Sequence, residues 1–159
     1  MKNNLPATRK THPGFTLLEM LLVVAAIGVL AGIVIVALNP SKQLGDTNNA
    51  KRRADINTVL NAVYQFSIDN NGNLPGGIPI TPCGTFSTNE ICNTDAVSCD
   101  NLVNLSELTL EEKYLVAIPK DPTGATINGS GYHISQSAYD RITTCAPHAE
   151  QEEEIEASR

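Results

Sequence analysis

The feature that most constrains this chain is an unbroken apolar run from Phe15 to Leu38. Its 24 residues contain one charged side chain, Glu19. As a helix rising about 1.5 Å per residue, the run would reach about 36 Å, enough to cross a hydrocarbon core of about 30 Å with some tilt. It is longer than the apolar part of a secretory signal peptide, and the following Asn39 and Pro40 do not form a signal-peptidase cleavage pattern. The sequence therefore predicts a retained membrane helix.

Charge is distributed unevenly on the two sides of this run. Lys2, Arg9 and Lys10 precede it with no acid among them, and the cytoplasmic flanks of membrane helices are rich in such residues. We therefore expect the N-terminus in the cytoplasm and everything after Pro40 outside it. The chain has 11 Lys and Arg against 17 Asp and Glu, and the part after Gly14 carries a formal charge of −9. This acidic balance argues against direct binding of nucleic acid.

The carboxylate of Glu19 needs an explanation, because lipid penalises charge. At the centre of a spanning helix such a group costs about 2.5–3.5 kcal/mol. One interpretation places Glu19 near the cytoplasmic interface, where it stays hydrated at little cost. The other makes it a functional charge with a partner, and because the apolar run contains no base, that partner must come from elsewhere.

The segment "GFTLLE", Gly14 to Glu19, follows a short basic leader and begins the apolar run. This constellation resembles the class III signal of type IV pilins and of the pseudopilins of type II secretion. The resemblance implies that a membrane-bound prepilin peptidase cuts between Gly14 and Phe15 and methylates Phe15. It also implies that Glu19 pairs with the N-terminal amine of a neighbouring subunit in a filament. Further implied partners are sister pilin subunits in a homopolymer, an inner-membrane platform protein and a cytoplasmic assembly ATPase.

The resemblance also implies an α+β pilin fold, in which a long N-terminal helix packs on a small antiparallel sheet in a disulfide-bonded head. The expected parts are a cleaved leader, a transmembrane and filament-core helix, an amphipathic continuation after a Pro/Gly kink, a globular head and an acidic tail. Their expected ranges are 1–14, 15–38, 39–72, 73–146 and 147–159.

Glycines and a proline punctuate the long helix. Gly28 and Gly32 form a G-x-x-x-G step, which lets helices approach closely in lipid or in a filament core, although glycine is also simply common in membrane helices. We expect the helix to be interrupted at Asn39 and Pro40, because proline removes a backbone donor and restricts the residue before it. Gly45 should weaken the next turns as well. The resemblance implies an extensible hinge there, and the alternative is an ordinary kink.

Helical periodicity resumes beyond residue 50. One apolar face is predicted from Ile56, Val59, Leu60, Val63 and Phe66. Lys51, Arg52, Arg53 and Asp55 are expected on a solvated or subunit-facing side, with Lys51 and Asp55 pairing weakly at a spacing of four. The helix should end near Gly72, which can adopt a left-handed cap.

The rest of the chain predicts a head of short elements. The alternating segments "GYHIS" and "RITT" indicate a hairpin through "QSAYD". A three-stranded sheet needs one more strand, for which the sequence indicates no position. Leu102, Leu105 and Leu108 have helical spacing, and Thr109 with Glu112 forms a candidate capping box. The terminal acidic run is expected to be a solvated tail or a frayed helix.

Four cysteines, Cys83, Cys92, Cys99 and Cys145, all follow the apolar run, which fits an oxidising, extracytoplasmic setting. They admit three complete pairings. Because Cys92 and Cys99 enclose only six residues, the spacing favours a local bridge between them, which leaves Cys83 to join Cys145.

The segment "IPKDPTG", from Ile118 to Gly124, resembles the turn before the sheet in major pseudopilins and competence-type pilins. Several of those heads hold calcium in an acidic loop. Here Asp121 and Asp140 are isolated in sequence, so we expect no metal or other cofactor, with calcium as the minority alternative. Two prolines and a glycine also simply shape a turn.

No motif indicates an enzyme. His12, His133 and His148 are dispersed, and neither a nucleophile elbow nor a phosphate loop is present. The leading hypothesis is a prepilin that is processed and polymerised into a type IV pilus-like filament outside the cell. One alternative is a pseudopilin of a type II secretion system, which forms a periplasmic filament. The other is a membrane-anchored extracytoplasmic binding domain that never polymerises.

Overall fold

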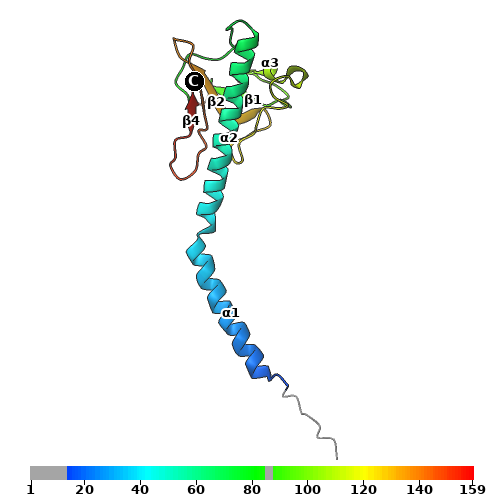
Figure 1. Cartoon of the computed structure of the whole chain (residues 1–159), viewed down its shortest axis with the longest axis vertical. Coiled ribbons are helices and arrows are strands. Elements are labelled where there is room, and N and C mark those ends of the chain that lie inside the picture. The colour runs from blue at the N-terminus through cyan, green and yellow to red at the C-terminus, as the bar shows by residue number, and fades with distance from the viewer. Residues whose placement is uncertain (1–13, 85–87) are drawn as a thin grey trace, which may run out of the picture. The chain divides into compact units, whose positions relative to one another are not determined.

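The computed structural model describes residues 14–84 and 88–159. The predicted leader, residues 1–14, therefore lies outside the described residues except for Gly14. The chain divides near residue 40 into two compact units. The first contains helix α1 (Leu17–Leu38), and the second, here called the head, extends from Ser41 to Arg159 (Figure 1).

Helix α1 buries none of its 22 residues. It is the one helix of the described chain that is long and apolar enough to cross a membrane. It ends at Asn39, whose φ of 41° and ψ of 76° lie in the left-handed region. Asparagine is among the few residues that tolerate this conformation. Every apolar side chain of α1 therefore lacks a partner within its own unit.

The predicted interruption of the helix at Asn39 and Pro40 is confirmed, and the hinge at Pro40 and Gly45 stays a prediction. Non-helical backbone occurs at Asn39, and Pro40 is the first residue of helix α2 (Pro40–Asp69), a position where its missing N–H costs nothing. Gly45 lies inside α2 and is buried. A Cβ atom there would lie 2.7 Å from the Gln151 side chain and 2.9 Å from that of Glu150. The glycine therefore makes room for a crossing segment of the head instead of breaking the helix.

The predicted apolar face of α2 is confirmed. The buried side chains include Ile56, Val59, Leu60 and Val63, and Phe66 is partly buried against the same core. The helix ends near the expected cap. The Gly72 N–H donates to the Ser67 carbonyl at 2.8 Å, and the Gly72 φ of 89° is of the kind that glycine adopts readily.

The head contains a four-stranded antiparallel sheet in the order β1-β2-β3-β4. The strands are β1 (Glu90–Cys92), β2 (Gly129–Gln136), β3 (Ile142–Cys145) and β4 (Glu156–Ser158). The predicted hairpin is confirmed as β2 and β3, with Gln136 opposite Ile142 and His133 opposite Cys145. The fold is therefore α+β, with a long N-terminal helical region and a small antiparallel sheet.

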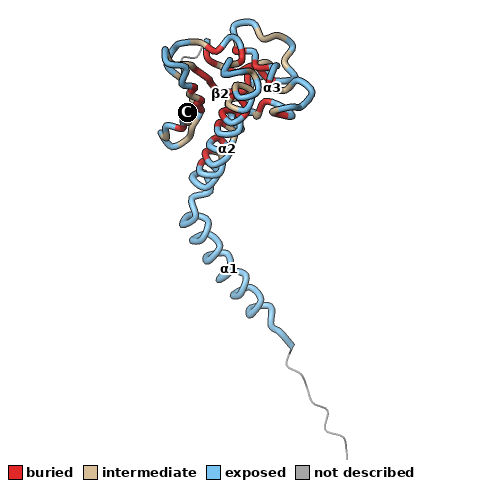
Figure 2. The backbone as a smooth tube through the Cα atoms, turned by 45° about the horizontal axis from the view of Figure 1, so that its top comes forward, coloured by how far each residue is buried: buried red, intermediate tan, exposed pale blue. Residues whose placement is uncertain are grey.

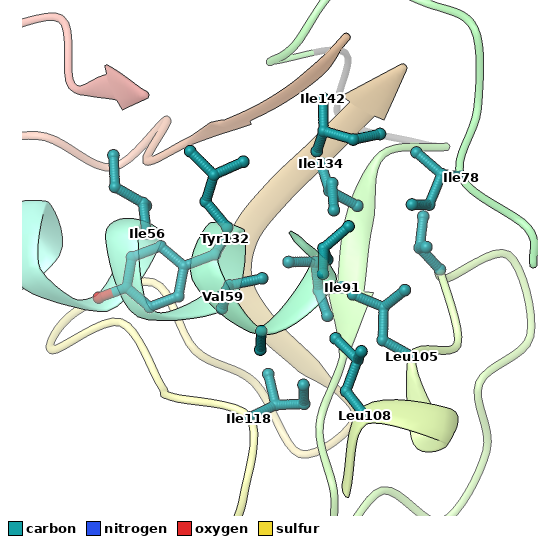
Figure 3. Packing of buried hydrophobic residues seen from close by; sticks show 14 of the residues in the cluster. Ile56, Val59, Ile78, Ile91, Leu105, Leu108, Ile118, Tyr132, Ile134 and Ile142 are labelled. Atoms are coloured by element: carbon teal, nitrogen blue, oxygen red, sulfur yellow. The ribbon is translucent and has the colours of Figure 1, made fainter. Parts of the chain in front are cut away.

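The core lies between α2 and the sheet. Figure 3 shows Ile56 and Val59 of α2 facing Tyr132 of the sheet, with Leu105 and Leu108 at the other end of the cluster. Leu108 belongs to the four-residue helix α3 (Ser106–Thr109), which a 3₁₀ turn follows (Leu110–Glu112). The predicted capping box at Thr109 is wrong, because Glu111 and Glu112 adopt positive φ and no regular helix begins there.

The C-terminal acidic run is not a tail. Ile155 is 4% exposed and joins the core, and its carbonyl accepts from the Ala146 N–H at 2.9 Å. The following β4 completes the sheet. Buried positions accordingly continue almost to the end of the chain (Figure 2). The head thus extends to Arg159, because the backbone of this segment finds hydrogen-bond partners in β3 and in α2.

Two disulfides close loops of the head. Cys83 bonds to Cys145 and Cys92 bonds to Cys99, which is the pairing that the sequence favours. The first bridge ties the segment after α2 to strand β3, over a separation of 62 residues. The second closes a local loop of seven.

Candidate processing and assembly site

The Gly14–Phe15 bond lies in a short non-helical stretch immediately before α1. Both residues are exposed, and a Cβ atom built on Gly14 would meet no other atom within 4 Å. A non-helical and exposed peptide bond is accessible to a peptidase, because no backbone hydrogen bonds of a helix must be broken first. The structure thus leaves the predicted cleavage position open.

Glu19 is part of a capping box that starts at Thr16. The Glu19 N–H donates to Thr16 Oγ1 at 3.2 Å, and the Glu19 carboxylate Oε2 accepts from the Thr16 N–H, also at 3.2 Å. The Thr16 hydroxyl lies 3.2 Å from the same oxygen. The box satisfies orphan N–H groups at the helix start. Sequence reasoning missed it, although T-x-x-E before an apolar run is its usual signature.

The capping box fixes the direction of the carboxylate. Glu19 Oε2 faces the backbone nitrogen of Thr16, one residue after Phe15, at the N-terminal end of α1. The partial positive charge of a helix N-terminus favours an anion at that position. The carboxylate is therefore held at the end of the helix where cleavage after Gly14 would place a new α-amine.

The surface of α1 offers places for close helix packing. Gly28 and Gly32 lie in α1, and a Cβ atom at either would meet nothing within 4 Å. Together with Val29, Ile33 and Val36 they line a shallow apolar hollow on the helix. Whether another helix occupies this hollow stays a prediction.

The head contains a buried ionic network that the sequence reasoning misplaced. Arg52, expected on the solvated side of α2, is fully buried. Its Nε donates to Asp121 Oδ2 at 2.7 Å and its Nη2 to Asp121 Oδ1 at 3.1 Å. Its Nη1 donates to Asn49 Oδ1 at 2.9 Å and to Glu150 Oε1 at 3.3 Å. One guanidinium thus joins α2, the loop at residue 121 and the C-terminal segment.

A sequence signal for this burial exists. The buried residues of α2 are Gly45, Asn49, Arg52, Ile56, Val59, Leu60, Ala62 and Val63. Steps of three and four lead from Gly45 to Ile56, so Arg52 continues the apolar stripe backwards. The stripe is hidden because its first members are small or polar. By contrast, the predicted pair of Lys51 and Asp55 is present, with partly exposed side chains.

Asp121 shapes the turn of "IPKDPTG". Its Oδ1 accepts from the Thr123 N–H at 2.9 Å and from the Gly124 N–H at 2.7 Å. Burial acts to raise the pKa of the Asp121 carboxyl, but the Arg52 guanidinium and these two backbone donors outweigh it and hold the pKa below its usual value. The carboxylate that sequence reasoning considered isolated is therefore committed to an ion pair.

A calcium site is not evident in residues 14–84 and 88–159. Within these ranges, no group of three or more His, Cys, Asp and Glu side chains is arranged to hold a metal ion. The Asp140 carboxylate accepts a hydrogen bond from Gln136 Nε2 at 2.6 Å. Of the histidines considered, His133 is buried in β2 and His148 lies near the C-terminal segment, while His12 lies outside the described residues.

The comparisons with known proteins address the same segments. A family model described as the prokaryotic N-terminal methylation motif matches residues 9–35, which include Gly14, Phe15 and Glu19. Type II secretion system core protein G of Escherichia coli K12 is 32% identical over 111 residues, covering 70% of this chain and 66% of that protein. The protein of the same name from Aeromonas hydrophila is 35% identical over 63 residues, covering 40% of this chain and 43% of that protein.

The chain thus spans just under two thirds of the first of these relatives and less than half of the second. No solved structure matches the chain significantly. The methylation motif and the identity to the Escherichia coli protein over 111 residues point to the same family. This chain belongs to the family of type IV pilins and type II secretion pseudopilins.

Proposed function

We propose that this chain is a prepilin, a structural subunit that is cleaved between Gly14 and Phe15, methylated at Phe15 and polymerised through α1 into a type IV pilus-like filament. The observation that carries the proposal is the contrast within α1. Its apolar side chains are all exposed, and its charged residue is held at the N-terminal end. Such a helix requires partners outside its own chain, either lipid or other copies of itself.

Cleavage would supply the missing partner of Glu19. It creates a positively charged α-amine on Phe15, and a second subunit's Glu19 can neutralise that amine in the filament. The attraction of opposite charges is much stronger in a medium of low dielectric than in water. An unpaired carboxylate there would be strongly disfavoured, so the pairing also selects one axial register between neighbouring helices. Gly28 and Gly32 would let the helices approach closely at that register.

The proposal includes a location and a set of partners. Before assembly, α1 crosses the cytoplasmic membrane once, with the basic leader inside and the head outside. Afterwards α1 becomes part of the filament core, and the disulfide-bonded head faces the oxidising exterior. The partners would be sister subunits, the prepilin peptidase, a platform protein in the membrane and an assembly ATPase. The proposed role is structural rather than enzymatic.

A pseudopilin of a type II secretion system is the second candidate. The observation that favours it is specific: both of the similar proteins carry the name of a type II secretion core protein. In that case the filament would be a short periplasmic one. The chemistry of processing and the pairing of Glu19 would be the same, so the two candidates differ in filament length and location.

Mass spectrometry of the mature chain from its native cells tests the shared part of the proposal. We expect a chain that begins at an N-methylated Phe15. An intact leader would instead favour a membrane-anchored binding domain that never polymerises.

Imaging of sheared surface filaments then separates the two filament candidates. Long filaments that contain this chain indicate a pilus. Their absence, together with a secretion defect on deletion of the chain, indicates a pseudopilus.

A further inference from the structure

We infer that the turn between β2 and β3 binds a second copy of this chain, with Tyr139 and Arg141 seated in a recess beside the C-terminal end of α2. The inference rests on the proposed function, because it describes how heads of neighbouring subunits meet. It adds a contact between heads to the packing of α1.

The turn presents an exposed aromatic side chain. Tyr139 is 93% exposed, whereas Tyr132 is buried and Tyr64 and Tyr114 are partly buried. Large aromatic side chains that become buried at a contact are among the commonest energetic anchors of protein interfaces. A chain with only four tyrosines, three phenylalanines and no tryptophan leaves this one almost fully in solvent.

The turn is ordered by its own hydrogen bonds. Ser137 Oγ accepts from the Tyr139 N–H at 3.2 Å and from the Arg141 N–H at 3.0 Å. The Ser137 N–H donates to the Arg141 carbonyl at 2.8 Å, and Gln136 Nε2 donates to Asp140 Oδ1 at 2.6 Å. Such a preorganised turn loses little conformational entropy on binding.

Arg141 gives the turn a positive charge. In the described part of the chain, no ion pair involves its guanidinium. The residue is exposed and lies two positions from Tyr139. The contact surface that fits this turn should therefore combine an apolar recess with acidic groups at its rim.

The recess between α2 and the segment after α3 has this composition. It has a volume of about 320 Å³, and its apolar lining includes Phe66, Leu110 and Tyr114. Phe66 and Tyr114 pack edge to face with ring centroids 5.6 Å apart. Leu110 is 69% exposed, so the recess has apolar surface left to cover.

The rim of the recess is acidic. Glu107 and Glu111 line it and are exposed. Lys113 also lines it, but its ammonium pairs with Asp69 at 2.8 Å and lies 4.7 Å from the Tyr114 ring centroid. The two glutamates are therefore available to Arg141 of another copy, which is the charge complementarity that selects this occupant.

The turn and the recess lie on opposite flanks of α2. Ile142, at the end of the turn, pairs with Arg159, and Arg159 Nη1 donates to Asn61 Oδ1 at 3.0 Å. The recess is lined by Phe66, five residues further along α2, which at about 100° per residue is about 140° away around the helix. Figure 1 shows β4 and α3 on opposite sides of α2.

This placement has a consequence for assembly. The turn of one copy cannot reach the recess of the same copy, because the two lie on opposite flanks of α2. The contact therefore joins two different surfaces on two neighbouring copies. It is a heterologous contact, which propagates from copy to copy and suits a helical filament.

Cysteine crosslinking of the full chain in its native cells tests the inference. With Tyr139→Cys and Leu110→Cys in one chain, we expect a ladder of disulfide-linked multimers. A mixture of the two single variants should give dimers only, and either single variant alone should give none. The matched control combines Leu110→Cys with Ile127→Cys, an exposed apolar residue outside the recess, and should give no ladder.

The failure of this contact can be distinguished from failure of the proposed function. Processed chains and normal filaments without the crosslinked ladder would overturn the head contact alone. Dimers formed by Tyr139→Cys alone would also overturn it, because they indicate a symmetric contact between turns.

A charge exchange gives a second readout that does not depend on cysteines. Arg141→Glu should lower filament yield about fivefold, in line with an ion pair at an exposed rim. Glu111→Arg added to that variant should restore most of the yield. Equal yields from all these variants would overturn the role of Arg141.

Discussion

Helix α1 and helix α2 follow each other in sequence, yet they obtain their stability in opposite ways. Helix α1 is apolar and buries nothing, whereas α2 is largely polar and buries eight residues against the head. The apolar helix therefore depends on lipid or other subunits, and the polar helix depends on its own chain. The change from the exposed apolar helix to the packed polar helix occurs within a few residues of Asn39.

The comparison shows that burial in this chain does not follow hydrophobicity. The largest fully buried side chain is Arg52 of α2, whereas most of the exposed large apolar side chains belong to α1. A buried charge is tolerated because Asp121, Glu150 and Asn49 surround it. The head is thus stabilised by its own contacts, whereas α1 needs lipid or other subunits to cover its apolar side chains.

The largest expected effect comes from breaking the buried network. Arg52→Ala should lower the free energy of unfolding of the head by about 3–5 kcal/mol, because it leaves Asp121 buried without its counter-ion. Arg53→Ala is the matched control. Its pair with Glu153 is half exposed, and the expected loss is at most about 1 kcal/mol. Urea unfolding of the full chain in detergent measures both losses. Equal losses would contradict the claim that the buried face of α2 stabilises the head more than its exposed face does.

The two disulfides should differ in how much they contribute to the stability of the head. In the chain-entropy model, removing the Cys83–Cys145 bridge costs about 4 kcal/mol and removing the Cys92–Cys99 bridge about 2 kcal/mol, because the first closes a loop of 62 residues and the second one of seven. Double Cys→Ser variants of each pair, compared by thermal unfolding, measure the difference. A larger loss from the short loop would show that chain entropy is not what these bridges control.

The head should become less stable in acid. Burial, with a smaller contribution from His148, lowers the pKa of the His133 imidazole to about 4, whereas an unfolded histidine titrates near 6.5. Between pH 4 and pH 6.5 the unfolded chain binds more protons at this histidine than the folded chain does. The contribution of the neutral, buried His133 to the stability of the head is therefore complete above about pH 6.5 and is lost as the pH falls toward 4. Its full size is about 3 kcal/mol at most.

The Asp121 carboxyl, whose pKa is held low, adds a further loss only below its unfolded pKa of about 3.9. His133→Gln should flatten the stability profile between pH 4 and 6.5 and leave the loss below that range in place. Thermal unfolding across this pH series provides the measurement. An unchanged slope in the variant would assign the acid sensitivity to other groups.

The smallest effect is expected at Gly45. Gly45→Ala adds a methyl group where the Gln151 and Glu150 side chains lie, but Gln151 is exposed and can move aside. The gain in helix propensity of about 1 kcal/mol offsets the loss of the Gln151 hydrogen bonds to Lys42 and Asp46. The stability should change by less than about 1 kcal/mol. A loss above about 2 kcal/mol would show that the crossing segment cannot adjust.

The elements of the molecule whose signals are local could be predicted from sequence. The apolar run predicts α1, the spacing of Ile56, Val59 and Val63 predicts the buried face of α2, and alternation predicts β2 and β3. The short loop between Cys92 and Cys99 indicates the disulfide pairing. Each inference depends on residues that are close in sequence.

The errors concern contacts between distant segments. Arg52 and Asp121 are 69 residues apart, and each looks solvated without the other. The segment that leads into strand β4 is rich in glutamate, and the pairing of β4 with β3 depends on the buried Ile155 beside it. Composition alone favours a solvated tail there. Two local signals were also misjudged: the capping box at Thr16 was missed, and the one predicted at Thr109 is not formed.

The capping role of Glu19 also decides how its functional role must be tested. Glu19→Gln removes the charge and keeps a side-chain oxygen for the Thr16 N–H, whereas Thr16→Ala removes the cap at a cost of about 1 kcal/mol and keeps the charge. Both variants should be cleaved after Gly14, and both should leave the unfolding midpoint of the head unchanged.

The most direct test of the account is the filament yield of these two variants, measured in the native cells. If α1 is completed by a Glu19–amine pair between subunits, Thr16→Ala will assemble nearly as well as the wild type, and Glu19→Gln will be processed but will assemble poorly. Normal filaments from Glu19→Gln, or an equal defect in both variants, would contradict the pairing and reduce Glu19 to a helix cap.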